Sequence, residues 1–282
     1  MLATEPTPLN EILETMTQKS PLKPPEMPQN QTNNPPKSNP LPTSSDPPRI
    51  DDGDESILDE FKLIRKLAEK NDIPYHEYRD FETLNDFKKY LRKKEQKRME
   101  NLIKSAKIPK IFATARATDF RITDRNEESA LTAIKAITDN NGLFIYGEPG
   151  TGKTMLASII ANERAELFKS SMFLRTVDIF HELNPYLNED KFETTRKRNS
   201  ILKTPCLIID DLGAEKPSDF TRANLFDILD FRMNEQLQTI ITTNFNIAQL
   251  QNRLNANEEL NLSDKIIRRI RHSCEIIELK HF

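Results

Sequence analysis

The sequence has 282 residues, a net charge of −3 and no tryptophan. It contains no apolar run of about 18 residues, and the stretch MLATEPTPLNE lacks the charged and apolar regions of a secretory signal, so we expect a cytoplasmic protein without membrane contact. The two cysteines, Cys206 and Cys274, lie in apolar runs without clustered histidines, which predicts buried, reduced thiols rather than a disulfide or a metal site.

The first 60 residues differ in composition from the rest of the chain. They hold twelve of the 18 prolines together with four basic and eleven acidic residues, so their net charge is −7 and that of the remainder is +4. Such a segment buries too little apolar surface to offset its ordering entropy. We therefore predict a disordered, proline-rich tail over residues 1–53.

Residues 54–104 predict a small helical module. Apolar residues recur at spacings of three and four over 54–70, and the NDIP at 71–74 ends that helix. The apolar face of a second helix contains Phe81, Leu84, Phe87 and Leu91. Its polar face continues into KKYLRKKEQKR at 88–98, with seven basic residues against one acidic. These helices suit either a partner-binding module or an arm that packs on the main domain.

The remaining residues, 105–282, have the composition of one α/β domain. Short apolar runs, each of strand length, occur at 143–146, 171–174, 206–209, 239–243 and 274–279. A loop or a helical pattern follows each of the first four runs, which is typical of parallel strands buried on both faces. We predict a three-layer α/β fold of the P-loop type with a five-stranded parallel sheet.

The stretch YGEPGTGKT at 146–154 fits G-x-x-x-x-G-K-[ST], the signature of a loop that wraps nucleotide phosphates. Its glycines let successive backbone N–H groups point at phosphate oxygens, and the helix predicted at 153–165 adds its N-terminal dipole. We expect Lys153 to reach the β and γ phosphates and Thr154 to bind Mg²⁺. The predicted phosphate-binding residues are Gly147, Glu148, Pro149, Gly150, Thr151, Gly152, Lys153 and Thr154.

A second motif, LIIDD at 207–211, is an apolar strand that ends in two carboxylates. Asp210 is placed to bind Mg²⁺, while Asp211 is placed to orient and polarise the attacking water. A merely solvated strand end is the alternative. Many ATPases have Glu at the second position, and because Asp is one methylene shorter, slow hydrolysis is compatible with this motif.

A third strand, TIITTNFN, ends in the polar residues Thr242, Thr243 and Asn244. A polar side chain at the end of a central strand beside the phosphate loop is placed to sense the γ-phosphate or to hold the lytic water. Threonine and asparagine also end strands without any such role, so this motif is weak by itself.

The segment SDKIIRRIRHS predicts a helix with Ser263 as its N-cap. Its apolar face is formed by Ile266, Ile267 and Ile270. At 100° per residue Arg268 then points to solvent, whereas Arg269 and Arg271 flank the apolar stripe on opposite sides. A flanking arginine suits either an arginine finger, which reaches the γ-phosphate bound by a neighbouring subunit, or an ordinary surface residue.

These four elements, in this order, resemble the AAA+ ATPases and more closely the bacterial helicase loaders of the DnaC/DnaI type, with their transposition relatives of the IstB type. The likeness covers about residues 105–282. It is carried by IPKIF, YGEPGTGKTMLASIIAN, FLRTVDIFHEL, LIIDDLGAEKPSDF, RMNEQLQTIITTNFN and IIRRIR.

The resemblance implies an ATPase that assembles on the replicative DNA helicase and places the helicase ring on single-stranded DNA. By position, the ATP and Mg²⁺ residues are Lys153, Thr154, Asp210 and Asp211. Asn244 matches the first sensor, and Arg269 matches the finger through which subunits self-associate. The module at 54–104 takes the place of the helicase-binding module, and residues 176–199 take that of the extra helix of initiators and loaders.

The sequence departs from this family in two places. No cysteine precedes Cys206, so the N-terminal zinc site of some members has no counterpart here. The residues after Asn244 are too few for the full C-terminal lid of most AAA+ proteins, so we expect the core without that lid.

Contacts with DNA are implied by the loop that follows the acidic strand. By position, Ser218 and Phe220 match the DNA-facing loop of the loaders, with Lys216 and Arg222 close by; the alternative is that Phe220 packs on the helix predicted at 220–235. The basic run at 196–198 adds either phosphate contacts or a solvated face.

Two other functions use the same motifs. An IstB-type transposition ATPase would share the whole core but bind duplex DNA and a transposase. A nucleotide-gated binding module would bind ATP with little hydrolysis, and Asp211 would then not act on water.

Overall fold

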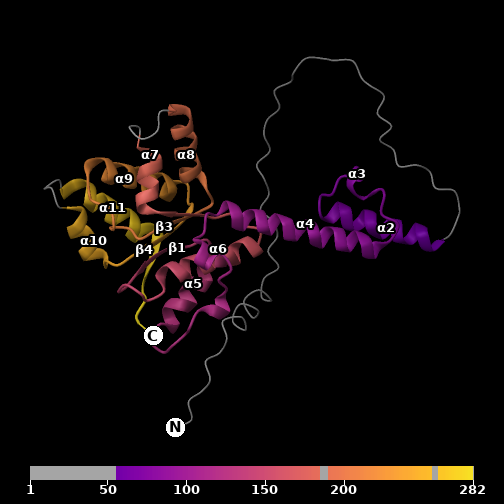
Figure 1. Cartoon of the computed structure of the whole chain (residues 1–282), viewed down its shortest axis with the longest axis horizontal. Helices are drawn as coiled ribbons and strands as arrows, with labels where there is room; N and C mark the ends of the chain where they lie inside the picture. The colour runs from indigo at the N-terminus through magenta and orange to yellow at the C-terminus, as the bar shows by residue number, and fades with distance from the viewer. Residues whose placement is uncertain (1–54, 185–189, 256–259, 282) are drawn as a thin grey trace, which may run out of the picture. The chain divides into compact units, whose positions relative to one another are not determined.

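The computed structural model describes residues 55–184, 190–255 and 260–281, which fall into two compact units (Figure 1). The smaller unit comprises residues 55–96 and the larger unit residues 97–281. The tail predicted over 1–53 lies outside the described residues. None of the helices in the described part of the chain has the length and apolar character needed to cross a bilayer.

The smaller unit consists of α2 (Glu55–Lys70), α3 (Tyr75–Tyr78) and the first part of α4 (Leu84–Ser105). The break predicted at 71–74 is present, with Asp72 in the left-handed region at φ 50°. The backbone N–H of Leu84 donates to Glu60 Oε2 at 2.6 Å, which satisfies a free donor at the start of α4. The buried apolar residues of this unit, among those described, are Ile64, Ala68, Tyr78 and Phe87. The division between the two units falls in the sequence of α4, between residues 96 and 97. The domain boundary expected after residue 104 stays a prediction.

The larger unit is built on a five-stranded parallel sheet in the order β2-β3-β4-β1-β5. The strands are β1 (Gly142–Tyr146), β2 (Met172–Arg175), β3 (Cys206–Asp210), β4 (Gln238–Thr243) and β5 (Cys274–Glu278). Each of the five apolar runs in the sequence therefore forms a strand. The predicted α/β fold with a parallel sheet is confirmed.

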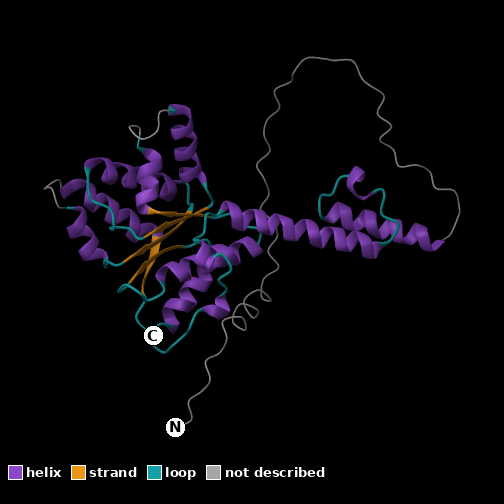
Figure 2. Ribbon diagram, viewed as in Figure 1, coloured by secondary structure: helices purple, strands orange, loops and turns teal. Residues whose placement is uncertain are grey.

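Helices cover both faces of the sheet, because successive side chains of each strand point to opposite faces (Figure 2). Leu143 and Ile145 pack on one face with α5 (Glu127–Asp139) and α6 (Lys153–Glu166), and Phe144 packs on the other. The helices on that second face are α7 (Thr176–Leu183), α8 (Lys191–Lys203), α9 (Asp219–Asn234), α10 (Ile247–Leu254) and α11 (Leu260–Ser273). Each buried Leu or Ile side chain contributes roughly 1.5–3 kcal/mol.

The segment before the sheet carries two short 3-10 helices, Lys110–Phe112 and Ala117–Asp119. It is tied to α6 by Asn162, whose side-chain amide donates to the carbonyls of Phe112 and Ala115 at 3.0 and 2.9 Å. The segment that leads to β1 thus packs beside the helix that follows the phosphate loop.

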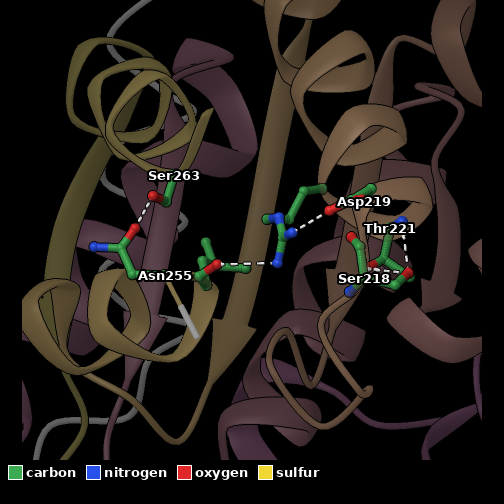
Figure 3. Close-up of polar contacts among 7 residues, drawn as sticks. Ser218, Asp219, Thr221, Asn255 and Ser263 are labelled. Carbon is green, nitrogen blue, oxygen red and sulfur yellow. Dashed lines mark hydrogen bonds and ion pairs between the residues drawn. The ribbon is translucent and has the colours of Figure 1, made fainter. Parts of the chain in front are cut away.

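Two predicted helices differ in detail from the structure. The helix expected over 176–199 is two helices, α7 and α8, with residues 185–189 between them outside the described part. The cap predicted at Ser263 is wrong, because α11 begins at Leu260 and Ser263 lies inside it. The hydroxyl of Ser263 is buried and donates to the side chain of Asn255, which follows α10 (Figure 3). Ser263, which the sequence predicts as a helix cap, instead links α11 to the residue that follows α10.

Arg232 is a buried cation that joins three elements of the second face. From α9, its guanidinium donates to the carbonyls of Ile201, Leu202 and Thr204 at the end of α8, and to Thr239 Oγ1 and the Gln238 carbonyl at the start of β4. Burial lowers the pKa of Arg232 to about 10. The carbonyls at the end of a helix are the favourable place for such a charge.

Candidate nucleotide-binding site

The phosphate loop occupies residues 147–152 between β1 and α6. Gly150 and Gly152 have φ values of 83° and 92°, in the left-handed region that side chains disfavour, so the loop needs glycine at both positions. α6 begins at Lys153, directly after the loop, and its free N–H groups and dipole face the loop. The sequence motif therefore folds into an anion-binding turn.

Lys153 lies within the loop rather than in solvent, with 8% of the residue exposed. Its ammonium donates to the carbonyls of Gly147 and Glu148 at 2.9 and 2.7 Å, and Thr151 Oγ1 is 3.5 Å away. Burial lowers the pKa of Lys153, while the carboxylates of Asp211 and Asp210 act in the opposite direction. The ammonium is thus held between the loop and the strand-end acids.

The Mg²⁺ residues predicted from the sequence lie next to each other. Thr154 Oγ1 donates to Asp210 Oδ1 at 3.0 Å, although the two residues are far apart in the chain. Asp210 is 5% exposed, and burial raises the pKa of its carboxyl group, while hydrogen bonds from Thr242 and Thr154 act to lower it. The two oxygen-bearing side chains form one buried polar cluster.

Asp211 and Asn244 also lie close together, at the surface. Asn244 Nδ2 is 3.5 Å from Asp211 Oδ1, a long contact, and both side chains are exposed. Asp211 has φ 58°, an uncommon left-handed conformation for a residue with a side chain. This turn of the chain directs Asp211 away from the strand, so the two acids of the DD pair occupy different environments, one buried and one exposed.

The strand order explains why these groups face one another. β4 lies between β1, which leads into the phosphate loop, and β3, which ends in the acids. Neighbouring strands are roughly 4.8 Å apart, so the axes of β1 and β3 lie about 10 Å apart with β4 between them. The carboxyl end of β4, with its polar residues, therefore lies between the carboxyl ends of these two strands. Open parallel sheets bind ligands at this edge.

The residues present suit a nucleoside triphosphate with Mg²⁺. The loop offers backbone N–H groups and an ammonium for phosphate oxygens. Thr154 and Asp210 offer the hard oxygen ligands that Mg²⁺ prefers, two side chains at most, as is usual for a metal that phosphates also bind. Among the described residues no cluster of three or more His, Cys, Asp or Glu side chains suggests a different metal, and both cysteines are buried and free.

Arg269 has a partner within its own chain. Its Nε donates to Asp230 Oδ1 at 2.7 Å, and its guanidinium lies 5.4 Å from the centre of the Phe226 ring; both partners are on α9. The side chain is 26% exposed, while Arg268 and Arg271 are exposed. The apolar face predicted for α11 is buried as expected. The assignment of Arg269 as a finger stays a prediction.

The two predicted DNA-contact residues lie at the start of α9. Ser218 is the N-cap of that helix: its hydroxyl accepts from Thr221 N at 3.2 Å, and its own N–H donates to Thr221 Oγ1 at 2.9 Å (Figure 3). Phe220 is 36% exposed. Arg222, in contrast, is buried at 2% and binds Asp219 and the Leu254 carbonyl, so it is a structural residue. The roles of Ser218 and Phe220 stay predictions.

Two arginines of α8 have acidic partners nearby. Arg196 pairs with Glu193 at 2.8 Å within the helix, and Arg198 donates to Asn224 and Asp227 of α9 at 3.0 Å each. The two guanidinium groups therefore lie along α8, with Arg198 turned toward α9. The basic run of α4 is largely exposed.

One contact of the site is not predicted from the sequence. The sequence predicts Thr242 only as a polar strand end, but its hydroxyl lies between the two acids, 2.5 Å from Asp210 Oδ1 and 3.0 Å from Asp211 N. The signal was present in the sequence, since a polar residue at the end of the strand next to the acidic strand is placed to reach it.

A phosphate loop, an acidic strand end and a polar strand end on a sheet of this order define a P-loop nucleotide-binding protein of the AAA+ class. Residues 55–281 match the model of the IstB-like ATP binding protein family. The chain belongs to that family and is related to the DnaI and DnaC helicase loaders.

Individual relatives carry two different functional names. The replicative helicase loader DnaI of Bacillus subtilis (strain 168) is 32% identical over 168 residues, 56% of this chain and 52% of that protein. The ATP-binding protein ascribed to insertion sequence IS1162 of Pseudomonas fluorescens is 26% identical over 153 residues, 53% of this chain and 65% of that protein. A crystal structure of DnaI matches with a TM-score of 0.56 and 32% identity over 61% of this chain and 95% of that one. The chain spans about half the length of the helicase loaders it matches.

Proposed function

We propose that this protein binds ATP with Mg²⁺ and hydrolyses it. The observation that carries the proposal is the convergence of Lys153, Thr154, Asp210, Asp211 and Asn244 at one edge of the sheet. Phosphoryl transfer needs little covalent help from the protein, because positioning and charge stabilisation supply most of the rate. A site of this composition meets that requirement.

Each residue has a distinct part in this proposal. Lys153 would bind the β and γ phosphates, and Thr154 and Asp210 would hold Mg²⁺, which would supply positive charge to neutralise the phosphates. Asp211 orients and polarises the attacking water at the surface of the site. Asn244 orients the Asp211 carboxylate and contacts the γ-phosphate. Arg269 is proposed to act on the ATP of a neighbouring copy, which requires that it leave Asp230 on assembly.

At the level of the cell we propose a helicase loader that delivers the replicative DNA helicase to single-stranded DNA. The relative with 32% identity is named a replicative helicase loader, which supports this choice. The helicase contact is assigned to residues 54–104 and the contact with single-stranded DNA to Ser218 and Phe220. Phe220, with 36% of the residue exposed, is available for stacking on a base.

A second function, that of a transposition ATPase, is supported by the family model and by the relative from insertion sequence IS1162. Such a protein would bind duplex DNA and a transposase instead of a helicase. Binding measured with matched single-stranded and duplex oligonucleotides, each with ATP, separates the two proposals. Preference for the single strand favours the loader, and preference for the duplex favours the transposition ATPase.

The phosphate-loop assignment is tested with Lys153→Ala in the full chain. ATP turnover is expected to fall by about 10²–10³-fold, since a charge that stabilises the transition state is lost. Lys169→Ala is the matched control, because Lys169 is also partly buried and donates to the Thr138 carbonyl at 3.0 Å, outside the site. Turnover that survives in Lys153→Ala would refute the assignment.

Hydrolysis and nucleotide gating are separated with Asp211→Asn. If Asp211 acts on water, turnover falls by about 10²-fold or more while ATP binding is kept. Helicase capture, measured by a pull-down with the replicative helicase of the host with and without ATP, then shows whether binding alone is sufficient. An Asp211→Asn protein that captures and loads the helicase as well as the wild type would mean that the protein is gated by nucleotide binding alone.

A further inference from the structure

The turn that follows β3 is held in place by the end of β4. It comprises residues 211–213 and begins with Asp211, directly after Asp210, the last residue of the strand. Thr243 Oγ1 donates to the Leu212 carbonyl at 2.6 Å, and Leu212 N donates to the Thr242 carbonyl at 2.8 Å. Within the turn, Gly213 N donates to Glu215 Oε2 at 2.9 Å. The position of the acids is therefore set mainly by a neighbouring strand.

Thr242 makes the contacts that reach the acids themselves. Its hydroxyl donates to Asp210 Oδ1 at 2.5 Å and accepts from the backbone N–H of Asp211 at 3.0 Å. A threonine hydroxyl has one hydrogen to donate, so the bond to Asp210 fixes the rotation of the hydroxyl and leaves a lone pair for Asp211. The residue is 1% exposed, so water does not compete for these bonds.

The hydrogen bond between the Asp211 N–H and Thr242 helps to hold the backbone conformation of Asp211. Asp211 has φ 58°, which costs energy for a residue with a Cβ and persists where the surroundings hold it. The Thr242 hydroxyl satisfies the N–H of Asp211 in this conformation. It thereby helps to keep the Asp211 side chain at the surface, where Asn244 Nδ2 lies 3.5 Å from it.

The hydrogen bond that Thr242 donates to Asp210 orients the carboxylate that we assign to Mg²⁺. The same oxygen, Oδ1, accepts from both Thr242 and Thr154. Two hydrogen bonds to the same oxygen restrict rotation of the carboxylate. Hydrogen bonds of this kind orient metal ligands, and their loss typically weakens metal binding or activity by about 10–100-fold.

We propose that Thr242 is a positioning residue that holds Asp210 and Asp211 in their working orientations. It acts through these two acids. This inference rests on the proposed ATP hydrolysis. It predicts that loss of the hydroxyl changes Mg²⁺ dependence and turnover together and leaves nucleotide binding without Mg²⁺ unchanged. A purely structural hydroxyl would change stability only.

The test compares Thr242→Val, which keeps the shape of the side chain and removes the hydroxyl, with Thr242→Ser, which keeps the hydroxyl. Thr239→Val is the matched control, because Thr239 is a threonine on the same strand, 3% exposed, whose hydroxyl accepts from Arg232 at 3.0 Å away from the site. Thr242→Cys has a thiol that is a poor hydrogen-bond partner, so the result does not depend on the folding of the valine variant alone.

Three quantities are measured on the full chain: turnover against ATP concentration, turnover against Mg²⁺ concentration, and the rise in Tm that ADP causes with Mg²⁺ and with EDTA. For Thr242→Val we expect kcat to fall about 10–100-fold, the half-saturating Mg²⁺ concentration to rise about 10-fold, and KM for ATP to stay within about threefold. The rise in Tm is expected to shrink with Mg²⁺ and to persist with EDTA. Thr242→Ser and Thr239→Val should resemble the wild type, and Thr242→Cys should follow Thr242→Val.

The outcomes separate this inference from the proposed function. A wild-type protein that neither hydrolyses ATP nor is stabilised by ADP refutes the proposed function itself. A wild-type protein that hydrolyses ATP, with Thr242→Val or Thr242→Cys matching Thr239→Val in all three measurements, overturns the positioning role alone. Equal losses in Thr242→Val and Thr239→Val would likewise reduce Thr242 to a structural residue.

Discussion

The two units of the chain bury their apolar side chains in different ways. In the larger unit, apolar layers enclose a sheet from both faces, and the polar ends of three strands converge on one edge. In the smaller unit, a single cluster closes one core, and its fully buried members, from Ile64 to Phe87, are near neighbours in the sequence. The comparison teaches that the larger unit depends on contacts between distant residues, whereas the smaller unit depends on a few aromatic side chains.

The prediction with the largest expected effect asks whether the nucleotide site of the larger unit is complete in one copy of the chain. Arg269→Ala should lower ATP turnover of the assembled protein by about 10³-fold, the lower range for an arginine finger, and leave ATP affinity unchanged. The measurement is turnover as a function of protein concentration, with Arg268→Ala as the control, since Arg268 is exposed on the same helix. Asp230→Ala breaks the internal ion pair and keeps the arginine. Equal losses in Asp230→Ala and Arg269→Ala would show that only the internal contact matters.

The next prediction asks whether the stability of the smaller unit depends on one aromatic residue. Phe87 is fully buried, and its ring centre lies 5.3 Å from that of Phe81 and 6.2 Å from that of Tyr78. Phe87→Ala should destabilise this unit by about 3–5 kcal/mol, because a large cavity replaces the ring. Hydrogen exchange over α2 and α3 measures the loss, and affinity for a fluorescent ATP analogue reports on the larger unit.

Leu63→Ala is the control for that experiment, because Leu63 is 50% exposed and its truncation should change stability by less than about 0.5 kcal/mol. We expect nucleotide affinity to be the same in both variants. A loss of nucleotide affinity in Phe87→Ala would show that the two units do not function separately.

The prediction with the smallest expected effect concerns the stability of the larger unit at alkaline pH, because that unit contains both cysteines. Burial raises the pKa of Cys274 to about 12. Because the folded protein holds this proton more tightly, the raised pKa contributes stability that is fully present below the pKa of the unfolded thiol, near 8.5. This contribution is lost as pH rises toward 12. The free energy of unfolding should therefore fall by about 1.4 kcal/mol per pH unit for this thiol between about pH 9 and 11.

Denaturant unfolding at pH 8, 9 and 10 measures that slope, and Cys274→Ala should reduce it. Burial also raises the pKa of Cys206, which therefore adds to the slope in the same direction. An identical slope in wild type and Cys274→Ala would show that the thiol ionises as readily in the folded as in the unfolded protein.

Local patterns in the sequence were enough to predict the sheet and the phosphate loop. The five apolar runs became strands, and the glycines of the loop have the backbone angles that the motif requires. The contact between Thr154 and Asp210 follows from the rule that parallel strands bring their carboxyl ends to the same edge of the sheet. These features depend on residue type and spacing alone.

Features that depend on side-chain contacts between distant elements could not be predicted in this way. The pairing of Arg269 with Asp230, the contact of Ser263 with Asn255 and the hydroxyl of Thr242 between the two acids all need the register of packed elements. Helix periodicity places Arg269 beside the apolar stripe, but it does not specify which residue of α9 lies opposite. The wrong cap at Ser263 has the same origin.

Arg232 has a mechanical consequence for the larger unit. The guanidinium ties the last carbonyls of α8 to the first residues of β4, and the same strand ends beside Asn244. A displacement of the end of α8 would therefore act, through these hydrogen bonds, on the first residues of the strand that Asn244 follows.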